Sequence, residues 1–159
     1  MHPLVEEAAK KAAVAWIGLP GAQPYPVWCL WIEDALYVVT GPGEQPAPGL
    51  ADATAAEVSF RGDHGGRIVT WPAEVSRLDP GGERWPAVVP QLAGKRLNAR
   101  GTAEETAARW AAQCVVSRLA PAGAPVTLPD DSGAAPPPPT PADRRTAKPF
   151  RLHRVRRAR

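Results

Sequence analysis

Between residues 14 and 78, the apolar residues of this chain fall into short runs that are closed by glycine, proline or an acidic turn. β-Branched and aromatic residues are frequent in these runs, which is typical of strands rather than helices. The connections between the runs are short, and this favours an antiparallel barrel or sandwich. The runs predicted to be strands span residues 14–18, 26–32, 35–40, 56–61 and 67–78.

Helical patterns flank this β-rich stretch. The spacing predicts an amphipathic helix over residues 3–13, because Pro3 suits a first helical turn and two glutamates precede two lysines by four positions. A second helix is predicted over 83–92. A third begins at Thr102 and Glu105, which match the capping box, and reaches residue 114. Residues 115–119 then form a sixth predicted strand.

The C-terminal part of the chain differs in composition from the rest. Residues 122–147 hold many of the 20 prolines of the 159-residue chain, and we interpret them as a linker that cannot bury enough apolar surface to fold. Residues 144–159 hold eight Lys or Arg and no acid, whereas residues 1–143 hold 11 Lys or Arg and 16 Asp or Glu. We therefore expect a folded domain over 1–121, a linker over 122–147 and a basic tail over 148–159.

Several classes of function are disfavoured by composition. The basic residues gather in the tail and not in the folded part, so we expect no specific nucleic-acid binding. Cys29 and Cys114 are the only cysteines, and no spacing of histidine and cysteine suits a metal site. No apolar run is long enough to span a bilayer, and no secretory signal is evident. We expect a cytoplasmic protein without a metal.

The succession of elements resembles a known family. A short helix, a strand, the strand that contains Trp28, a tight turn, the strand ending at Thr40, a Gly-rich loop and a further strand resemble the flavin-binding split-barrel proteins. That superfamily includes the pyridoxamine 5′-phosphate oxidases and the deazaflavin-dependent reductases. The resemblance covers about residues 4–121 and implies a mainly β fold with peripheral helices, a six-stranded antiparallel split β-barrel. The chain would be a divergent member.

The resemblance also implies where a flavin phosphate would lie. Family members hold it just after the third strand, in a pattern like Thr-x-x-x-Ser-x-Lys with a leucine four positions later. In this chain Thr40 and Leu50 match the first and last positions, but Glu44 stands in the serine position and Pro46 in the lysine position. A carboxylate opposes a phosphate, and the loop has lost its cation. Gln45 remains as a possible donor.

Two hypotheses follow from the resemblance. In the first, the chain is a homodimer that binds FMN or a deazaflavin at a groove between two barrels and acts as an oxidoreductase on a small molecule. The missing charge would then come from residues elsewhere, either Arg61, Arg67, Lys95 and Arg96 or the tail arginines. We expect the cofactor-binding residues to be Trp28, Thr40, Gln45, Arg61 and Trp71, and we assign no catalytic side chain.

In the second hypothesis, the barrel has lost the cofactor and serves as a binding or scaffold protein. It would interact with its partner through the proline- and arginine-rich C-terminal segment. The feature that supports it is the presence of Glu44 and Pro46 in the phosphate loop. Phe150, Leu152 and Val155 interrupt the arginines of the tail, which predicts that the tail docks, and docking over the groove of the chain itself would favour the first hypothesis. Under either hypothesis the six tryptophans can serve core and dimer-interface packing, whereas stacking on a flavin would involve Trp28 or Trp71.

Overall fold

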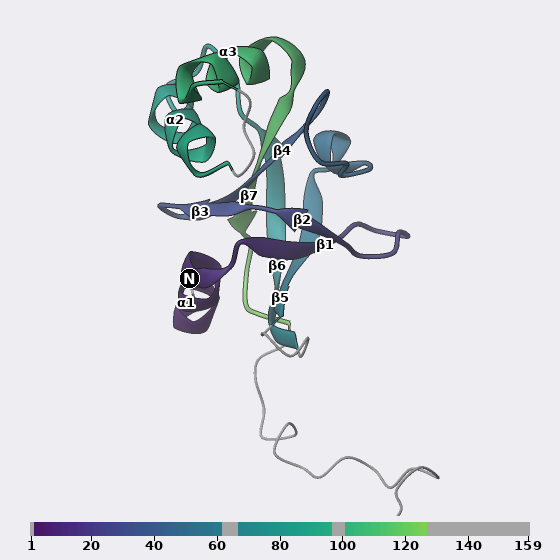
Figure 1. The fold of residues 1–159 in the computed structure, drawn as a ribbon. Helices are drawn as coiled ribbons and strands as arrows, with labels where there is room; N and C mark the ends of the chain where they lie inside the picture. Colours follow the sequence, from purple (N-terminus) through teal and green to yellow (C-terminus); the bar gives the residue numbers. More distant parts are fainter. Residues whose placement is uncertain (1, 62–66, 97–100, 127–159) are drawn as a thin grey trace, which may run out of the picture. The chain divides into compact units, whose positions relative to one another are not determined.

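The computed structural model of the chain describes residues 2–61, 67–96 and 101–126. Within these ranges three α-helices and one short 3-10 helix accompany seven strands (Figure 1). The elements in chain order are α1 (Pro3–Lys11), β1 (Val14–Gly18), β2 (Tyr25–Trp28), β3 (Leu30–Ile32), β4 (Ala35–Thr40), η1 (Leu50–Asp52), β5 (Ala55–Arg61), β6 (Arg67–Arg77), α2 (Trp85–Lys95), α3 (Ala103–Gln113) and β7 (Val115–Pro121).

The strands form one antiparallel sheet in the order β2-β1-β5-β6-β7-β4-β3. Strands β2 and β3 lie at opposite ends of this order, yet Cys29 alone separates them in the chain. The two ends of the sheet must therefore approach each other, and the sheet curls into a nearly closed barrel that is split between β2 and β3. The predicted antiparallel split barrel is confirmed, with seven strands where six were expected.

The extra strand arises at Cys29. The expected single strand over 26–32 is divided there, because β2 pairs with β1 whereas β3 pairs with β4. At the division the main-chain N–H of Cys29 donates to the carbonyl of Ala13 at 3.1 Å. The apolar pattern is continuous through this point, and it holds no information about which neighbour each half will pair with.

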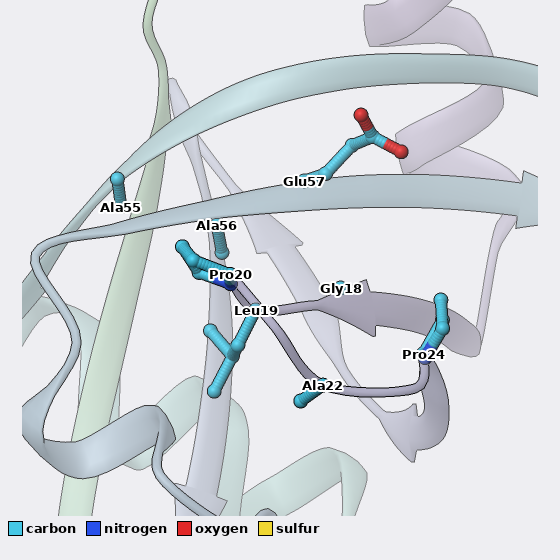
Figure 2. Close-up of a pocket in the computed structure, with 8 residues that line it drawn as sticks. All are labelled: Gly18, Leu19, Pro20, Ala22, Pro24, Ala55, Ala56 and Glu57. Carbon is cyan, nitrogen blue, oxygen red and sulfur yellow. The ribbon is translucent and has the colours of Figure 1, made fainter.

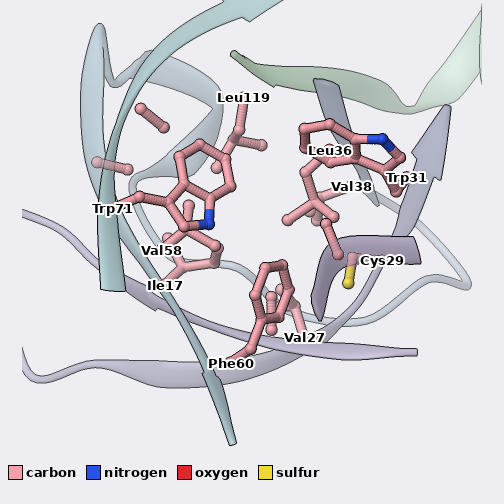
Figure 3. Close-up of a cluster of buried hydrophobic side chains, with 14 of the residues drawn as sticks. Ile17, Val27, Cys29, Trp31, Leu36, Val38, Val58, Phe60, Trp71 and Leu119 are labelled. Atoms are coloured by element: carbon pink, nitrogen blue, oxygen red, sulfur yellow. The ribbon is translucent and has the colours of Figure 1, made fainter. Parts of the chain in front are cut away.

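The barrel interior is filled by large apolar side chains (Figure 3). The indole rings of Trp31 and Trp71 meet edge to face, with centroids 6.3 Å apart and planes at 88°. This geometry is one that aromatic pairs prefer. Helix α1 contributes Val5 and Ala9 to the same cluster. Trp71 is 1% exposed and therefore packs inside the barrel.

A second apolar cluster lies on the outer face of β3, β4 and β7, against α2 and α3. The alternation of β4 explains both clusters, since Leu36 and Val38 belong to the interior while Tyr37 and Val39 belong to the outer cluster. In Figure 1, α2 and α3 lie together and apart from α1. Trp31 of β3 belongs to the interior cluster, whereas Trp28 at the end of β2 packs against the outer cluster.

The helix signals in the sequence are mostly confirmed. Thr102 Oγ1 accepts from the N–H of Glu105 at 3.2 Å, and the Glu105 carboxylate accepts from the N–H of Thr102 at 2.8 Å, which completes the capping box. In α1, both i,i+4 ion pairs are present. Helix α2 begins two residues later than expected and continues to Lys95.

The first residues of the expected linker lie along β6 and are hydrogen-bonded to it. The N–H of Ala122 donates to the carbonyl of Pro72 at 2.9 Å, and the N–H of Val126 donates to that of Thr70 at 2.8 Å. Residues 127–159 lie outside the described part of the chain, so the boundaries of the linker and tail stay predictions. In the ranges that the structure describes, no helix has the length and apolar character needed to cross a membrane.

Candidate functional site

The loop that follows β4 is held tightly against helix α3. Gly41 has a φ of +140°, and a Cβ atom placed there would lie 2.9 Å from both Cα and Sγ of Cys114. Only glycine tolerates this combination of backbone angle and close approach. Glycine at position 41 therefore lets the loop turn directly over the C-terminal end of α3, which places Glu44 beside that helix.

Glu44 is the centre of the site. Its side chain is only 3% exposed and accepts three hydrogen bonds from residues far away in the sequence. Oε1 accepts from Arg109 Nη2 at 2.6 Å and from Trp110 Nε1 at 2.8 Å. Oε2 accepts from Arg96 Nε at 2.9 Å. The carboxylate thus binds two guanidinium groups and one indole N–H.

This environment keeps the Glu44 carboxylate ionised. Burial alone would raise the pKa of Glu44, but the hydrogen bonds from the indole and the two guanidinium groups outweigh it. The pKa of Glu44 is consequently lower than that of an ordinary glutamate. At neutral pH the cluster contains one negative and two positive charges, as buried charge requires partners.

Arg109 and Arg96 have further contacts that fix their positions. Arg109 Nη1 donates to the carbonyl of Pro42 at 2.9 Å, so the same side chain holds the loop at two points. The guanidinium carbon of Arg96 lies 5.2 Å from the centroid of the Trp28 ring, within the range of a cation–π contact. The loop, the end of α2, helix α3 and the end of β2 therefore meet around one carboxylate.

Gln45 is engaged by the main chain of the barrel. Its Oε1 accepts from the N–H of Trp28 at 2.6 Å, while its Nε2 donates to the carbonyl of Trp28 at 2.7 Å. A longer contact of 3.5 Å joins Nε2 to the carbonyl of Val39. Both amide donor positions therefore face main-chain carbonyls and not a ligand.

The expected cofactor-binding residues separate into two groups. Trp28 and Gln45 lie together, and Thr40 ends β4 at the start of the same loop. Arg61 lies elsewhere on β5, with its guanidinium carbon 3.8 Å from the centroid of Trp16. Trp71 lies inside the barrel. Of the cations considered as substitutes, Arg96 is committed to Glu44, and the side chain of Arg67 is outside the described residues.

Two residues of the site were missed by the sequence reasoning. Arg109 and Trp110 stand 65 and 66 positions after Glu44, on a helix whose apolar pattern explains Trp110 as a core residue. No local motif links them to the loop. The one available signal was the charge of Glu44 itself, because a glutamate in a tight loop rich in glycine and proline needs a partner if it is buried.

A separate surface pocket lies between the β1–β2 connection and the start of β5 (Figure 2). It has a volume of about 380 Å³ and is mostly apolar. Its lining residues are Gly18, Leu19, Pro20, Ala22, Pro24, Ala55, Ala56 and Glu57. Glu57 is the charged group of this lining, so the pocket does not favour a phosphate. None of the expected cofactor-binding residues lines it.

Within the ranges that the structure describes, the types of side chain that bind metals do not cluster, and the thiol of Cys29 is buried. No group of three or more His, Cys, Asp or Glu residues suited to a metal ion occurs there. Cys29 is buried in the barrel, and burial raises the pKa of its thiol to about 12. A thiol with that pKa is protonated at neutral pH and is a poor nucleophile.

Comparison with known proteins depends on the fold, since no family model and no curated protein sequence matches the chain. The structure is similar to that of the heme storage protein HutZ from Vibrio cholerae, with a TM-score of 0.54 and 13% identity over 78% of this chain and 92% of the other. The chain has the split-barrel fold. The fold resemblance inferred from the sequence is thereby confirmed.

Two further split barrels show the same likeness. A candidate 5-nitroimidazole antibiotic resistance protein from Bacteroides thetaiotaomicron gives a TM-score of 0.50, with 14% identity over 75% of this chain and 78% of the other. A candidate pyridoxamine 5′-phosphate oxidase from Listeria innocua also gives 0.50, with 11% identity over 75% and 91%. At these identities the likeness establishes the fold of the chain.

Proposed function

We propose that this split barrel is a binding protein that does not hold FMN by its phosphate in the loop after β4. The observation that carries the proposal is the Glu44 carboxylate, which is buried and ionised in the position where the family resemblance places a phosphate donor. The phosphate of FMN does not fit the residues present, because the loop offers it a negative charge and no free cation.

The size of the electrostatic effect supports this reading. A negative charge brought within about 4 Å of the Glu44 carboxylate is repelled by about 4 kcal/mol if the effective dielectric constant is about 20. The guanidinium groups of Arg96 and Arg109 attract the same charge and offset part of this repulsion, but a loop with a lysine in place of Pro46 and no carboxylate would hold the phosphate more tightly. Arg96 and Arg109 already donate to that carboxylate, so a phosphate placed there would compete with Glu44 for them.

The C-terminal segment is the proposed point of contact with a partner. Residues 144–159 combine eight basic residues with apolar ones, a composition that suits an acidic and partly apolar protein surface. Association of two copies of the barrel into a homodimer belongs to the same proposal. Under this function the barrel acts as a scaffold and has no catalytic residue.

The second candidate is a flavin-dependent oxidoreductase that acts on a small molecule. Its supporting observation is the Arg96 guanidinium stacked on Trp28, since an aromatic face beside a cation suits a flat anionic ligand. FMN or a deazaflavin would supply the hydride chemistry itself. Its phosphate would have to be held by groups outside the loop after β4.

Flavin binding by the purified full-length chain separates the two candidates. We expect a colourless protein, and we expect added FMN to be bound no better than riboflavin, which lacks the phosphate. A flavin or deazaflavin that copurifies, or saturable quenching of FMN or deazaflavin fluorescence, would instead establish a bound redox cofactor and favour the second candidate. A full-length variant in which the eight basic residues of 144–159 are replaced by glutamine tests the contact with a partner protein. We expect this variant to lose the binding of any partner that the natural chain captures.

A further inference from the structure

Three donors converge on Glu44, two from helix α3 and one from the residue that follows α2, and each has a further contact besides Glu44. We propose that Arg96, Arg109 and Trp110 form an anion cradle, and that the chain fills this cradle with its own carboxylate. A small external oxyanion, such as formate or inorganic phosphate, would bind there once Glu44 is withdrawn. The inference rests on the proposed function, because it assumes that no ligand phosphate occupies the cradle in the natural chain.

Each donor has a contact besides Glu44, and for Trp110 and Arg96 that contact does not involve the loop that carries Glu44. The Trp110 side chain is 0% exposed in the cluster between β4, β7 and the helices, so its indole cannot turn away. Arg109 is also bonded to the carbonyl of Pro42. Arg96 is also stacked on Trp28. Preorganised donors of this kind keep their geometry when the bound group is removed, as an anion site requires.

The chemistry of the cradle matches an oxyanion. One carboxylate oxygen accepts from Arg109 and Trp110, and the other accepts from Arg96. Formate presents two oxygens with the same separation, and phosphate presents more acceptors to the same charged donors. Two positive charges would remain in the cradle of a variant without Glu44, so an anion there would relieve their mutual repulsion.

The sequence provides a means by which Glu44 could be withdrawn. Gly41 and Gly43 precede it with φ values of +140° and +79°, backbone angles that glycine adopts without strain on either side of Pro42. Glu44 N–H donates to the carbonyl of Gly41 at 3.0 Å, which closes a turn between them. A rearrangement of this turn would move the carboxylate together with Pro42, so Arg109 would lose its bond to the Pro42 carbonyl, whereas Trp110 and Arg96 would keep their other contacts.

Chemical rescue of a Glu44→Ala variant of the full-length chain tests the proposal. Thermal unfolding is measured in formate or inorganic phosphate against chloride at constant ionic strength. We expect either anion to raise the midpoint of Glu44→Ala saturably, by about 5 °C at ten times the dissociation constant. The wild-type midpoint should not change. The indole N–H resonance of Trp110 should shift in the same titration.

Glu44→Gln is the matched control, because its amide fills the cradle with nearly the volume of the native side chain. We expect no anion effect on its midpoint. If Glu44→Ala does not fold in chloride, it is refolded in formate, where recovery of folded protein supports the cradle. An unchanged midpoint in both anions, or failure to refold in either, overturns the cradle. Phosphate-dependent FMN binding by the wild type would instead overturn the proposed function.

Discussion

The side-chain amide of Gln45 pairs with the main chain of Trp28 in the way that a neighbouring strand would, with one accepted bond of 2.6 Å and one donated bond of 2.7 Å. Trp28 ends β2, which is an edge strand at the split of the barrel. One side chain from the loop after β4 therefore satisfies polar groups that the missing strand neighbour would have satisfied. Gln45 closes the barrel locally.

Replacement of Gln45 by alanine should accordingly destabilise the barrel. The half-buried N–H and carbonyl of Trp28 would lose their partners, which costs about 1–3 kcal/mol in the free energy of unfolding. Equilibrium unfolding in urea measures this. Gln91→Ala is the matched control, since Gln91 Nε2 also donates to a main-chain carbonyl, that of Ala87, but on an exposed helix face. We expect less than about 0.5 kcal/mol there, and equal losses would contradict the closing role of Gln45.

The pH dependence of stability should report on Glu44. Its pKa is lower in the folded chain than in the unfolded one, so its stabilising effect is complete above the ordinary glutamate pKa and is lost as pH falls through the lower folded value. Stability should thus be flat near pH 7 and decline below about pH 4.5. Glu44→Gln should lower stability at pH 7 by about 3 kcal/mol and flatten the acid decline.

Glu6 provides the control for that experiment. Its pKa is also lowered, through the hydrogen bond and charge of Lys10, but its carboxylate lies in solvent on α1. Glu6→Gln should therefore leave the acid decline nearly unchanged. If both variants had the same profile, the acid sensitivity would arise from surface charge in general and not from the Glu44 cluster.

Trp71 should behave as a core residue. Trp71→Ala would open a cavity beside Trp31 and is expected to cost about 3–5 kcal/mol in the free energy of unfolding. Trp16→Ala, which removes only a partly exposed ring beneath Arg61, should cost about 1 kcal/mol or less. A Trp71→Ala variant of wild-type stability that had lost flavin binding would instead favour the ligand-stacking role predicted from the sequence.

Local patterns in the sequence predicted the parts of the fold that depend on local interactions. The Thr102–Glu105 capping box and the ion pairs of α1 connect residues three or four positions apart, and both are present. In β4, by contrast, Leu36 and Val38 lie inside the barrel and Tyr37 and Val39 outside it, but all four are apolar and buried, so the sequence does not distinguish the two faces. Short apolar runs joined by short connections predicted an antiparallel barrel or sandwich, and the family resemblance favoured the barrel.

The centre of the site depends on long-range contacts that no local pattern contains. Glu44 and Arg96 are 52 positions apart, and α3 brings its two donors from still further along the chain. Alternation also shows which residues share a face but not which face is inside the barrel, which is why Trp71 could be read as a ligand contact. The break at Cys29 was hidden because both halves of the run are equally apolar.

Substitution of Gly41 tests whether the loop after β4 must lie as close to the end of α3 as it does in the structure. Gly41→Ala would place a Cβ atom 2.9 Å from Cys114 and would force an alanine to a φ of +140°, so we expect a loss of at least about 2 kcal/mol in the free energy of unfolding. Gly94→Ala is the matched control, because a Cβ atom at that helical position has no other atom within 4 Å. It should stabilise the chain by about 1 kcal/mol. If Gly41→Ala were neutral, the loop would have room to move from α3, and the tight placement of Glu44 would not depend on glycine at position 41.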